Sequence, residues 1–315
     1  MFPVSMEDIH HAAERIRPYA NHTPVFTSQT LNKLAGASVF LKCENFQKVG
    51  AFKFRGACNT VFSLSPKEAS KGVATHSSGN HAAALSLAAS IREIPAHIVM
   101  PENAPKVKKQ AVQNYGGQIT FCENTLTARE ETLSNLVEQC GATVVHPYND
   151  YRIIAGQGTA AAELLQDVPM PDYILAPVGG GGLLSGTALS AHYLSPKTKV
   201  VGVEPAGAAD AHKSFKTGTL HPSVSPKTIA DGLLTSLGDK TFTCIREFVS
   251  DIVTVDEEEI LGAMHFVWER MKIIIEPSSA VPVAAVLYHK IPCNDKRVGI
   301  IVSGGNVDLK SLPWL

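Results

Sequence analysis

Short apolar segments alternate with segments of helical periodicity along most of this 315-residue chain. The apolar segments predict strands at 39–42, 72–75, 96–100, 119–122, 143–145, 173–176, 199–204, 251–255 and 298–302. Helices are predicted at 5–18, 56–64, 82–91, 106–115, 128–140, 158–165, 257–271 and 278–289, with one more that begins at the glycine run 179–182. A polar region covers 205–240. Repeated strand–helix units predict an α/β fold whose parallel sheets are flanked by helices and bind ligands at the carboxyl ends of their strands.

The composition is that of an ordinary soluble protein. A net charge of -1 and 18% charged residues give no electrostatic reason to expect nucleic acid or membrane partners. No run reaches the roughly 18 apolar residues of a membrane span, and the first residues lack the order of a signal peptide. The six cysteines are scattered without a C-x-x-C pair, so they read as reduced thiols. We therefore expect a cytoplasmic location and no zinc site.

The stretch from Gly50 to Gly56 places Lys53 between two phenylalanines, with glycines on either side. An ammonium held among apolar rings loses hydration, which lowers its pKa and frees a neutral amine to attack a carbonyl. The alternative is a lysine that packs its stem on the rings and keeps its charge in water. The heptamer alone does not decide between the two.

The stretch from Thr75 to His81 follows a predicted strand and opens a predicted helix. Its hydroxyls and the backbone N–H groups of the helix start suit a carboxylate ligand. The alternative is that Ser78 or Asn80 simply caps the helix.

Four glycines, 179–182, lie between another strand and helix. Their N–H groups can converge on a phosphate at the positive end of the helix dipole. A dinucleotide fingerprint is the competitor, but its last glycine or alanine falls here on Leu184 or Ser185, although Glu204 stands where a ribose-binding acid is expected. A plain packing turn is the remaining alternative.

Two further loops follow strands. Ser303 comes directly after the last strand, where a hydroxyl can face a ligand or merely form a turn. Glu204 and Asp210 bracket a short loop with free carbonyls, and such a set suits a hard cation with oxygen ligands. The alternative for these acids is a solvated loop.

Phe-Lys-x-Arg-Gly, Ser-Ser-Gly-Asn-His, tetraglycine and Ser-Gly-Gly-Asn occur here in that order. This combination resembles the fold-type-II pyridoxal-phosphate (PLP) enzymes, and within them the serine racemase and serine/threonine dehydratase family. The resemblance covers essentially the whole chain. It implies a two-domain, tryptophan synthase β-like α/β fold, with a large cofactor-binding domain (1–48 and 147–315) and a small domain with the substrate loop (49–146). It also implies a homodimer.

The resemblance implies a role for each motif. Residues expected to hold PLP are Phe52, Lys53, Asn80, Gly179, Gly180, Gly181, Gly182 and Ser303. Residues expected at the substrate are Ser77, Ser78, Asn80, His81, Arg129 and Ser236. Residues expected to hold Mg²⁺ or another hard cation are Glu204, Ala208 (through its carbonyl) and Asp210.

Within these sets the resemblance makes Lys53 the Schiff-base lysine and the base on one face of the cofactor. Phe52 would stack on the ring, Asn80 would hydrogen-bond the ring hydroxyl, and Ser303 would face the pyridine nitrogen. A neutral serine there leaves the ring unprotonated, which weakens the electron sink and suits dehydration or racemisation better than transamination. Racemisation also needs a proton donor opposite Lys53, and Ser78 fills that position unless it only caps the helix.

The implied function is a serine racemase that also eliminates water from L-serine to give pyruvate and ammonia. The alternatives are an L-threonine or threo-3-hydroxyaspartate dehydratase with little racemisation and, in another class, a non-catalytic PLP- or nucleotide-binding protein. Three positions depart from the family. Ala51 replaces the usual serine, Tyr148 replaces the asparagine of the animal racemases, and Ala82-Ala83 replaces their Gly-Gln. The last change removes a glutamine on which activation by a nucleotide would depend. ATP remains a candidate effector.

Overall fold

Two sheets organise the structure, a computed structural model that describes residues 2–168, 170–312 and 314. The larger sheet has six strands in the order β1-β2-β10-β7-β8-β9, and all neighbours are parallel except β1 and β2. Its strands are β1 (Val25–Phe26), β2 (Ser38–Cys43), β7 (Tyr173–Pro177), β8 (Lys199–Pro205), β9 (Asp251–Val255) and β10 (Arg297–Val302).

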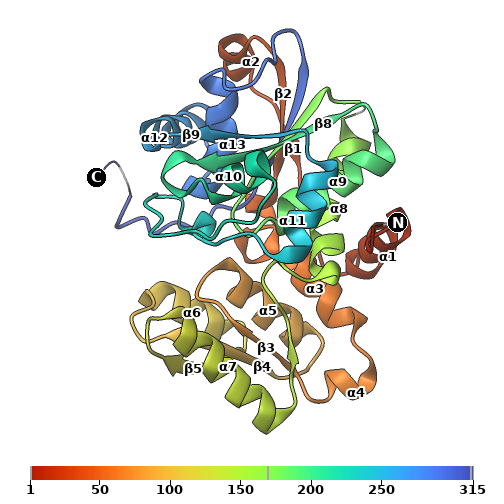
Figure 1. The fold of residues 1–315 in the computed structure, drawn as a ribbon, viewed down its shortest axis with the longest axis vertical. Helices are drawn as coiled ribbons and strands as arrows, with labels where there is room; N and C mark the ends of the chain where they lie inside the picture. Colours follow the sequence, from red (N-terminus) through yellow and green to blue (C-terminus); the bar gives the residue numbers. More distant parts are fainter. Residues whose placement is uncertain (1, 169, 313, 315) are drawn as a thin grey trace.

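The smaller sheet has four parallel strands in the order β5-β4-β3-β6 and lies in the lower part of Figure 1. Its strands are β3 (Val73–His76), β4 (Ala96–Pro101), β5 (Gln118–Cys122) and β6 (Thr143–Val144). The α/β fold with parallel sheets is therefore confirmed. The domain bounds 1–48, 49–146 and 147–315 stay a prediction, with the smaller sheet built from residues inside 49–146.

Helices cover both faces of each sheet (Figure 1). Their bounds are α1 (Met6–Ile16), α2 (Gln29–Ala35), α3 (Lys53–Ser63), α4 (Pro66–Ala69), α5 (Asn80–Ile91), α6 (Lys106–Asn114), α7 (Leu126–Cys140), α8 (Tyr151–Asp167), α9 (Gly182–Leu194), α10 (Asp210–Thr217), α11 (Asp239–Phe248), α12 (Glu257–Phe266) and α13 (Pro277–Leu287). A π-helical turn, Val267–Met271, extends α12.

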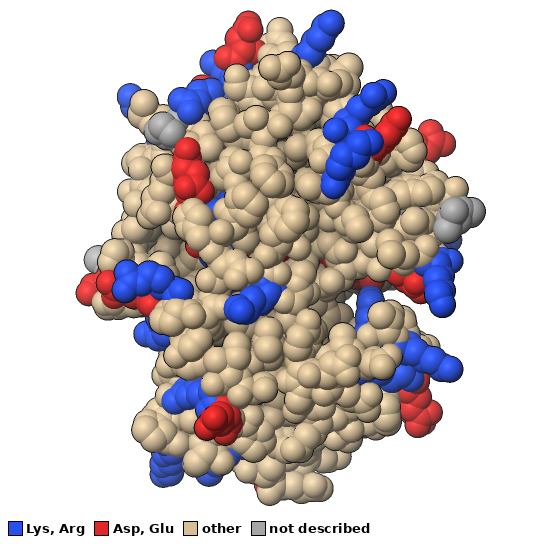
Figure 2. All heavy atoms as spheres, turned by 180° about the vertical axis from the view of Figure 1, so that it is seen from behind, with Lys and Arg blue, Asp and Glu red and all other residues tan. Residues whose placement is uncertain are grey.

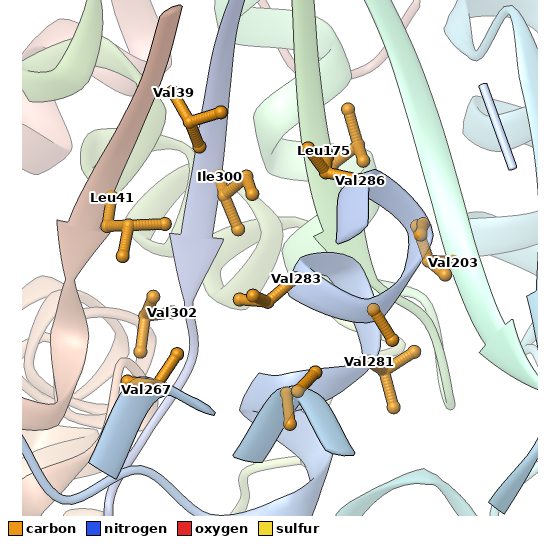
Figure 3. Packing of buried hydrophobic residues seen from close by; sticks show 14 of the residues in the cluster. Val39, Leu41, Leu175, Val203, Val267, Val281, Val283, Val286, Ile300 and Val302 are labelled. Carbon is orange, nitrogen blue, oxygen red and sulfur yellow. The ribbon is translucent and has the colours of Figure 1, made fainter. Parts of the chain in front are cut away.

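Alternate side chains along each strand of the larger sheet enter the apolar cores on its two faces. Val298, Ile300 and Val302 of β10 pack with α2, α12 and α13, whereas Ile301 faces α8 and α9 on the other side. Figure 3 shows the first of these layers, in which Val283 of α13 points toward β10 and Val286 lies beside Leu175 of β7. Because strand side chains alternate between faces, both faces of this sheet are apolar and both are covered.

Two predicted helix starts were wrong for identifiable reasons, and one region predicted only as polar contains a helix. α3 begins at Lys53 rather than after Gly56, so the lysine itself starts the helix. α8 begins at Tyr151 rather than at 158, because its glycines are sites of close helix packing and not helix starts: a Cβ on Gly156 would lie 2.7 Å from the Cα of Gly56. The region 205–240 contains α10, which ends at Gly218 in the left-handed conformation.

Four helices, α2, α4, α10 and α11, were not predicted at all. Among the described residues, no helix is long and apolar enough to cross a membrane. On the face seen in Figure 2, acidic and basic side chains lie among each other, in keeping with the net charge of -1.

Candidate active site

Lys53 lies at the first position of α3, and its amine donates a hydrogen bond to the carbonyl oxygen of Pro147 at 2.8 Å. Among the described residues, no carboxylate forms an ion pair with it. Burial therefore lowers the pKa of Lys53 to about 8, against a small opposing effect from Glu276. The Phe52 ring lies 5.1 Å from the amine, but Phe54 is fully buried in the core under α5. The expectation of two flanking rings is thus right for Phe52 and wrong for Phe54.

The glycine loop joins β7 to the 13-residue helix α9. The loop is buried, and the backbone N–H groups of Gly179, Gly180, Gly181 and Gly182 have no acceptor within the described part of the chain. Buried donors without acceptors at the start of a long helix suit an anion. Packing also demands glycine here, because a Cβ on Gly180 would overlap the ring of Tyr148.

Glu204, the acid that the dinucleotide alternative needs, is held at the start of α10. Both carboxylate oxygens of Glu204 accept backbone hydrogen bonds, from Ala211 at 2.9 Å and from His212 at 2.7 Å. Each oxygen keeps a further lone pair, so these bonds orient the carboxylate without excluding another ligand.

Ser303 follows β10 and is 2% exposed. Its carbonyl oxygen accepts the N–H of Phe52 at 2.9 Å, which joins the end of this strand to the start of α3. Its hydroxyl lies 2.9 Å from that of Ser279, which already donates to the carbonyl of Gly304. Because Ser279 has only one hydroxyl hydrogen, Ser303 is the donor between the two serines. To donate to a pyridine nitrogen, the Ser303 hydroxyl has to turn away from Ser279.

The loop between β3 and α5 carries the hydroxyls of Ser77 and Ser78. Its alternative role, capping of α5, is not seen in the part of the chain that the structure describes. The N-cap of α5 is Gly79, with no side-chain capping bond, so Ser78 and Asn80 do not cap the helix. The Ser77 hydroxyl accepts the N–H of Gly79 at 3.4 Å. The half-buried Ser78 hydroxyl has no partner among the described residues, which leaves it free to face a ligand.

Asn80 leads to a functional residue that the sequence reasoning missed. Its amide donates to both carboxylate oxygens of Glu276, at 3.1 and 3.2 Å, and its oxygen accepts from Asn306 at 2.9 Å. Glu276 is 4% exposed, and burial raises its pKa to about 7 although Asn80 lowers it. A lone acid before Pro277, in an apolar stretch, was the available sequence signal.

His81 is buried, and its Nε2 lies 3.1 Å from the carbonyl oxygen of Val145 while Nδ1 has no partner. Burial, followed by the charge of Lys53, lowers its pKa to about 3. The imidazole is therefore neutral and offers no charge to a substrate carboxylate. Any contact of His81 with such a group falls to its backbone N–H, in the first turn of α5.

Arg129 and Ser236 share no hydrogen bond with the residues around Lys53 in the described part of the chain. Arg129, on α7, donates to the side chain of Asn124 at 2.6 Å, and its Nε is buried without a partner. The Ser236 hydroxyl accepts the N–H of Ser223 at 2.8 Å. Their roles at the substrate stay a prediction.

The acidic loop after β8 is buried rather than solvated. Burial raises the pKa of Glu204 to about 8 and that of Asp210 to about 6. Both carboxylate oxygens of Asp210 are buried and have no hydrogen-bond partner among the described residues, although the nearby Ser223 hydroxyl lowers the pKa of this acid. No cluster of three or more metal-binding side chains occurs among the described residues, and the predicted set needs only two together with the carbonyl of Ala208. Unpartnered buried oxygens fit a hard cation.

Comparisons with known proteins agree with this geometry. Residues 16–304 match the family model described as pyridoxal-phosphate dependent enzyme. The chain is 51% identical to the beta-hydroxyaspartate dehydratase of Paracoccus denitrificans, with 100% of both chains covered. It is 50% identical to the serine racemase of Dictyostelium discoideum, with 99% of this chain and 98% of the relative covered. The crystal structure of that racemase superimposes with a TM-score of 0.94, covering 97% of this chain and 99% of the other.

Proposed function

The chain belongs to the family of pyridoxal-phosphate dependent enzymes, and from this premise we propose that it is a serine racemase that also eliminates water from L-serine. The observation that carries the proposal is the state of two side chains. Lys53 is a buried amine without a counter-charge, and Ser78 has a hydroxyl without a partner. Serine racemase is also the name of a relative at 50% identity.

The residues present fit PLP at each of its parts. The N–H groups of Gly179, Gly180, Gly181 and Gly182 have no acceptor among the described residues and would take the phosphate. Ser303 would face the ring nitrogen, and Asn80 would hydrogen-bond the ring hydroxyl. Phe52 would lie against the ring. When bound, PLP links through its aldehyde to amines and withdraws electrons from the α-carbon of the substrate.

Lys53 and Ser78 would transfer protons on opposite faces of the substrate. A pKa of about 8 leaves part of the Lys53 amine neutral near neutral pH, so Nζ can accept the α-proton on its face. The Pro147 carbonyl orients that amine through the 2.8 Å bond. In racemisation, Ser78 Oγ supplies a proton on the opposite face, while Ser77, Asn80 and His81 bind the substrate carboxylate at the start of α5. In elimination, the β-hydroxyl takes up the proton that Nζ removed from the α-carbon and leaves as water, and reaction of the unsaturated amine product with water gives pyruvate and ammonia.

Four further properties belong to the same proposal. Glu204, Asp210 and the carbonyl of Ala208 hold Mg²⁺ or a similar cation, supported by the unpartnered oxygens of Asp210. The enzyme works as a homodimer in the cytoplasm. ATP is a candidate effector.

A substrate panel tests the proposal. The protein is incubated with both serines, both threonines and the hydroxyaspartates, D-serine is assayed by chiral chromatography, and pyruvate release is followed. We expect D-serine and pyruvate from L-serine. Vigorous pyruvate release without any D-serine would remove the racemase half of the proposal.

A hydroxyaspartate dehydratase is the second candidate, because a relative with that name is 51% identical over its full length. It predicts the fastest turnover with a hydroxyaspartate and little D-serine from L-serine, and a threonine dehydratase predicts fastest turnover of L-threonine. A protein that only binds PLP predicts a yellow colour without turnover of any substrate.

A further inference from the structure

A cluster of buried charges lies beneath the start of α3, and none of the roles assigned above uses it. Two cations, Arg55 of α3 and Lys42 of β2, have completely buried side chains. They face the carboxylates of Glu44, Glu163 and Asp167, with Glu44 fully buried as well. Charges removed from water to this extent are retained only where good geometry compensates them.

Arg55 uses its guanidinium in two directions at once. Towards Glu44 it donates from Nε at 2.7 Å and from Nη2 at 2.8 Å. Towards Glu163, on α8, it donates from Nη1 and from Nη2, both at 2.7 Å. The carboxylates of Glu44 and Glu163 therefore each bind the planar guanidinium through two hydrogen bonds. This fixes the orientation of the guanidinium as well as its position.

Lys42 extends the cluster from the neighbouring strand. Its amine lies 2.8 Å from Glu163 and 3.4 Å from Asp167, and it donates to the carbonyl oxygen of Thr23 at 2.7 Å. Glu163 is thus shared between Arg55 and Lys42, and both cations lower its pKa against the effect of burial. The cluster ties α3 and α8 to the larger sheet.

The helices α3 and α8 touch at a pair of glycines directly beside this cluster. A Cβ on Gly156 would lie 2.8 Å from the carbonyl oxygen of Arg55, and the N–H of Gly56 donates to the side chain of Gln157 at 3.2 Å. Close contact at glycines sets the distance between the two helices, and Phe54, Ala57 and Cys58 of α3 pack in the core. The two bidentate pairs of Arg55 add a directional restraint on the rotation of α3 about its own axis.

This rotation matters because of where Lys53 lies. Residues two apart on a helix point about 200° apart, so Arg55 and Lys53 point to opposite sides of α3. Lys53 donates to Pro147, and α8 begins at Tyr151, shortly after that residue. The seating of α3 on α8 therefore sets how the Lys53 amine meets the Pro147 carbonyl.

We propose that Arg55 is a positioning residue, whose paired contacts with Glu44 and Glu163 hold the rotation of α3 on α8 and thereby aim the Lys53 amine at the Pro147 carbonyl. The inference rests on the proposed role of Lys53 as the lysine that carries the cofactor. It adds a residue that determines the orientation of the Lys53 amine from the opposite side of α3.

The test compares Arg55→Lys, Arg55→Met and Glu163→Gln with the control Leu164→Ala. Leu164 is fully buried on α8 but packs in the apolar core against the larger sheet, so its truncation lowers stability without touching the cluster. Each holoenzyme is measured at a temperature where it is folded. The readouts are the visible circular dichroism per bound cofactor, kcat, and KM for the panel substrate that the wild type converts fastest.

We expect the Arg55 variants to lose much of the visible dichroism and to lower kcat by on the order of 10²-fold, with KM nearly unchanged. Glu163→Gln, which keeps the shape of the acceptor, has a smaller effect in the same direction. Leu164→Ala lowers the melting temperature and leaves the dichroism and kcat as in the wild type. If Arg55→Met does not fold, Arg55→Lys and Glu163→Gln decide the matter.

Arg55 variants whose dichroism and kcat match those of Leu164→Ala would overturn the inference. A separate experiment tests the assignment of Lys53 independently of Arg55. Borohydride reduction of the wild-type holoenzyme, followed by peptide mass mapping, is expected to find the cofactor on Lys53. Attachment elsewhere would contradict the proposed function itself, independently of Arg55.

Discussion

Lys42 and Lys53 are two lysines withdrawn from water in one chain, and their surroundings are opposite. Lys42 meets Glu163 at 2.8 Å, Asp167 at 3.4 Å and the Thr23 carbonyl at 2.7 Å. Lys53 meets one carbonyl, and its pKa is lowered to about 8. Burial by itself therefore does not make a lysine reactive. What matters is burial without a compensating anion, because only then does the neutral amine become accessible near neutral pH.

The acids repeat this contrast. Glu44 is held by Arg55, whereas, in the part of the chain that the structure describes, Asp210 has no partner for either carboxylate oxygen and Glu276 accepts hydrogen bonds from amide groups alone. The buried pairs around Arg55 join elements of the scaffold, and the buried groups without a counter-charge are those proposed for the site. Each of the predictions below tests one side of this division.

The largest effect is expected for Lys53→Ala. Removing an uncompensated amine should abolish the visible absorption of attached cofactor and all turnover above background, while the melting temperature stays the same or rises. Lys53→Arg is the control, since it keeps a charge but cannot attach the cofactor. Attached cofactor in either variant would contradict the assignment of Lys53.

Lys42→Met should lower stability and leave cofactor attachment intact, the reverse of the result expected for Lys53→Ala. Removing one partner of a buried pair should lower the free energy of unfolding by about 3 kcal/mol, measured by denaturant titration. The absorption of attached cofactor should remain, because Arg55 still holds Glu163. Loss of that absorption without loss of stability would place Lys42 in the site and break the comparison.

Asp210→Asn tests the unpaired acid after β8. In wild-type protein treated with a chelator, added Mg²⁺ at a hundredfold excess over its Kd should stabilise the fold by about 2.7 kcal/mol. Asp210→Asn should lose that response, as followed by thermal unfolding. Asp256→Asn is the matched control, because Asp256 is an exposed N-cap at which asparagine caps equally well. An equal response in all three proteins would remove the cation from this loop.

Glu276→Gln should change how stability depends on pH. The pKa of Glu276 is raised from 4.5 to about 7, so its favourable contribution is complete below pH 4.5 and is lost as the pH rises through 7. The variant should therefore gain stability relative to the wild type across this window, by about 3 kcal/mol at pH 8. Parallel stability curves for the two proteins would show that Glu276 is compensated in a way that its amide contacts do not reveal.

Sequence periodicity predicted the strands well and the contacts between distant residues poorly. β3, β7 and β10 were readable because short apolar runs between turn residues have few other interpretations. The starts of α3 and α8 were misplaced because Gly56 and Gly158 looked like helix boundaries, whereas glycines on these helices mark close packing, as where Gly156 meets Gly56. That contact joins residues 100 apart in the sequence, and no local pattern records it.

The candidate site divides in the same way. The loops at Ser77, Gly179 and Ser303 were found because each follows a strand, and parallel strands bring their ends together. Glu276 was missed because its importance comes from Asn80 and Asn306, which approach it from other elements. The Arg55 cluster was missed for the same reason, since Glu163 lies 108 residues from Arg55 in the sequence.

The most direct test of the proposed function is the product ratio of Ser78→Ala with L-serine as substrate, with D-serine measured by chiral chromatography and pyruvate measured in the same reaction. A free hydroxyl that acts only on the face opposite Lys53 predicts that pyruvate formation stays within a few-fold of the wild type while D-serine disappears. An equal loss of both products would contradict the two-face mechanism, and so would undiminished D-serine.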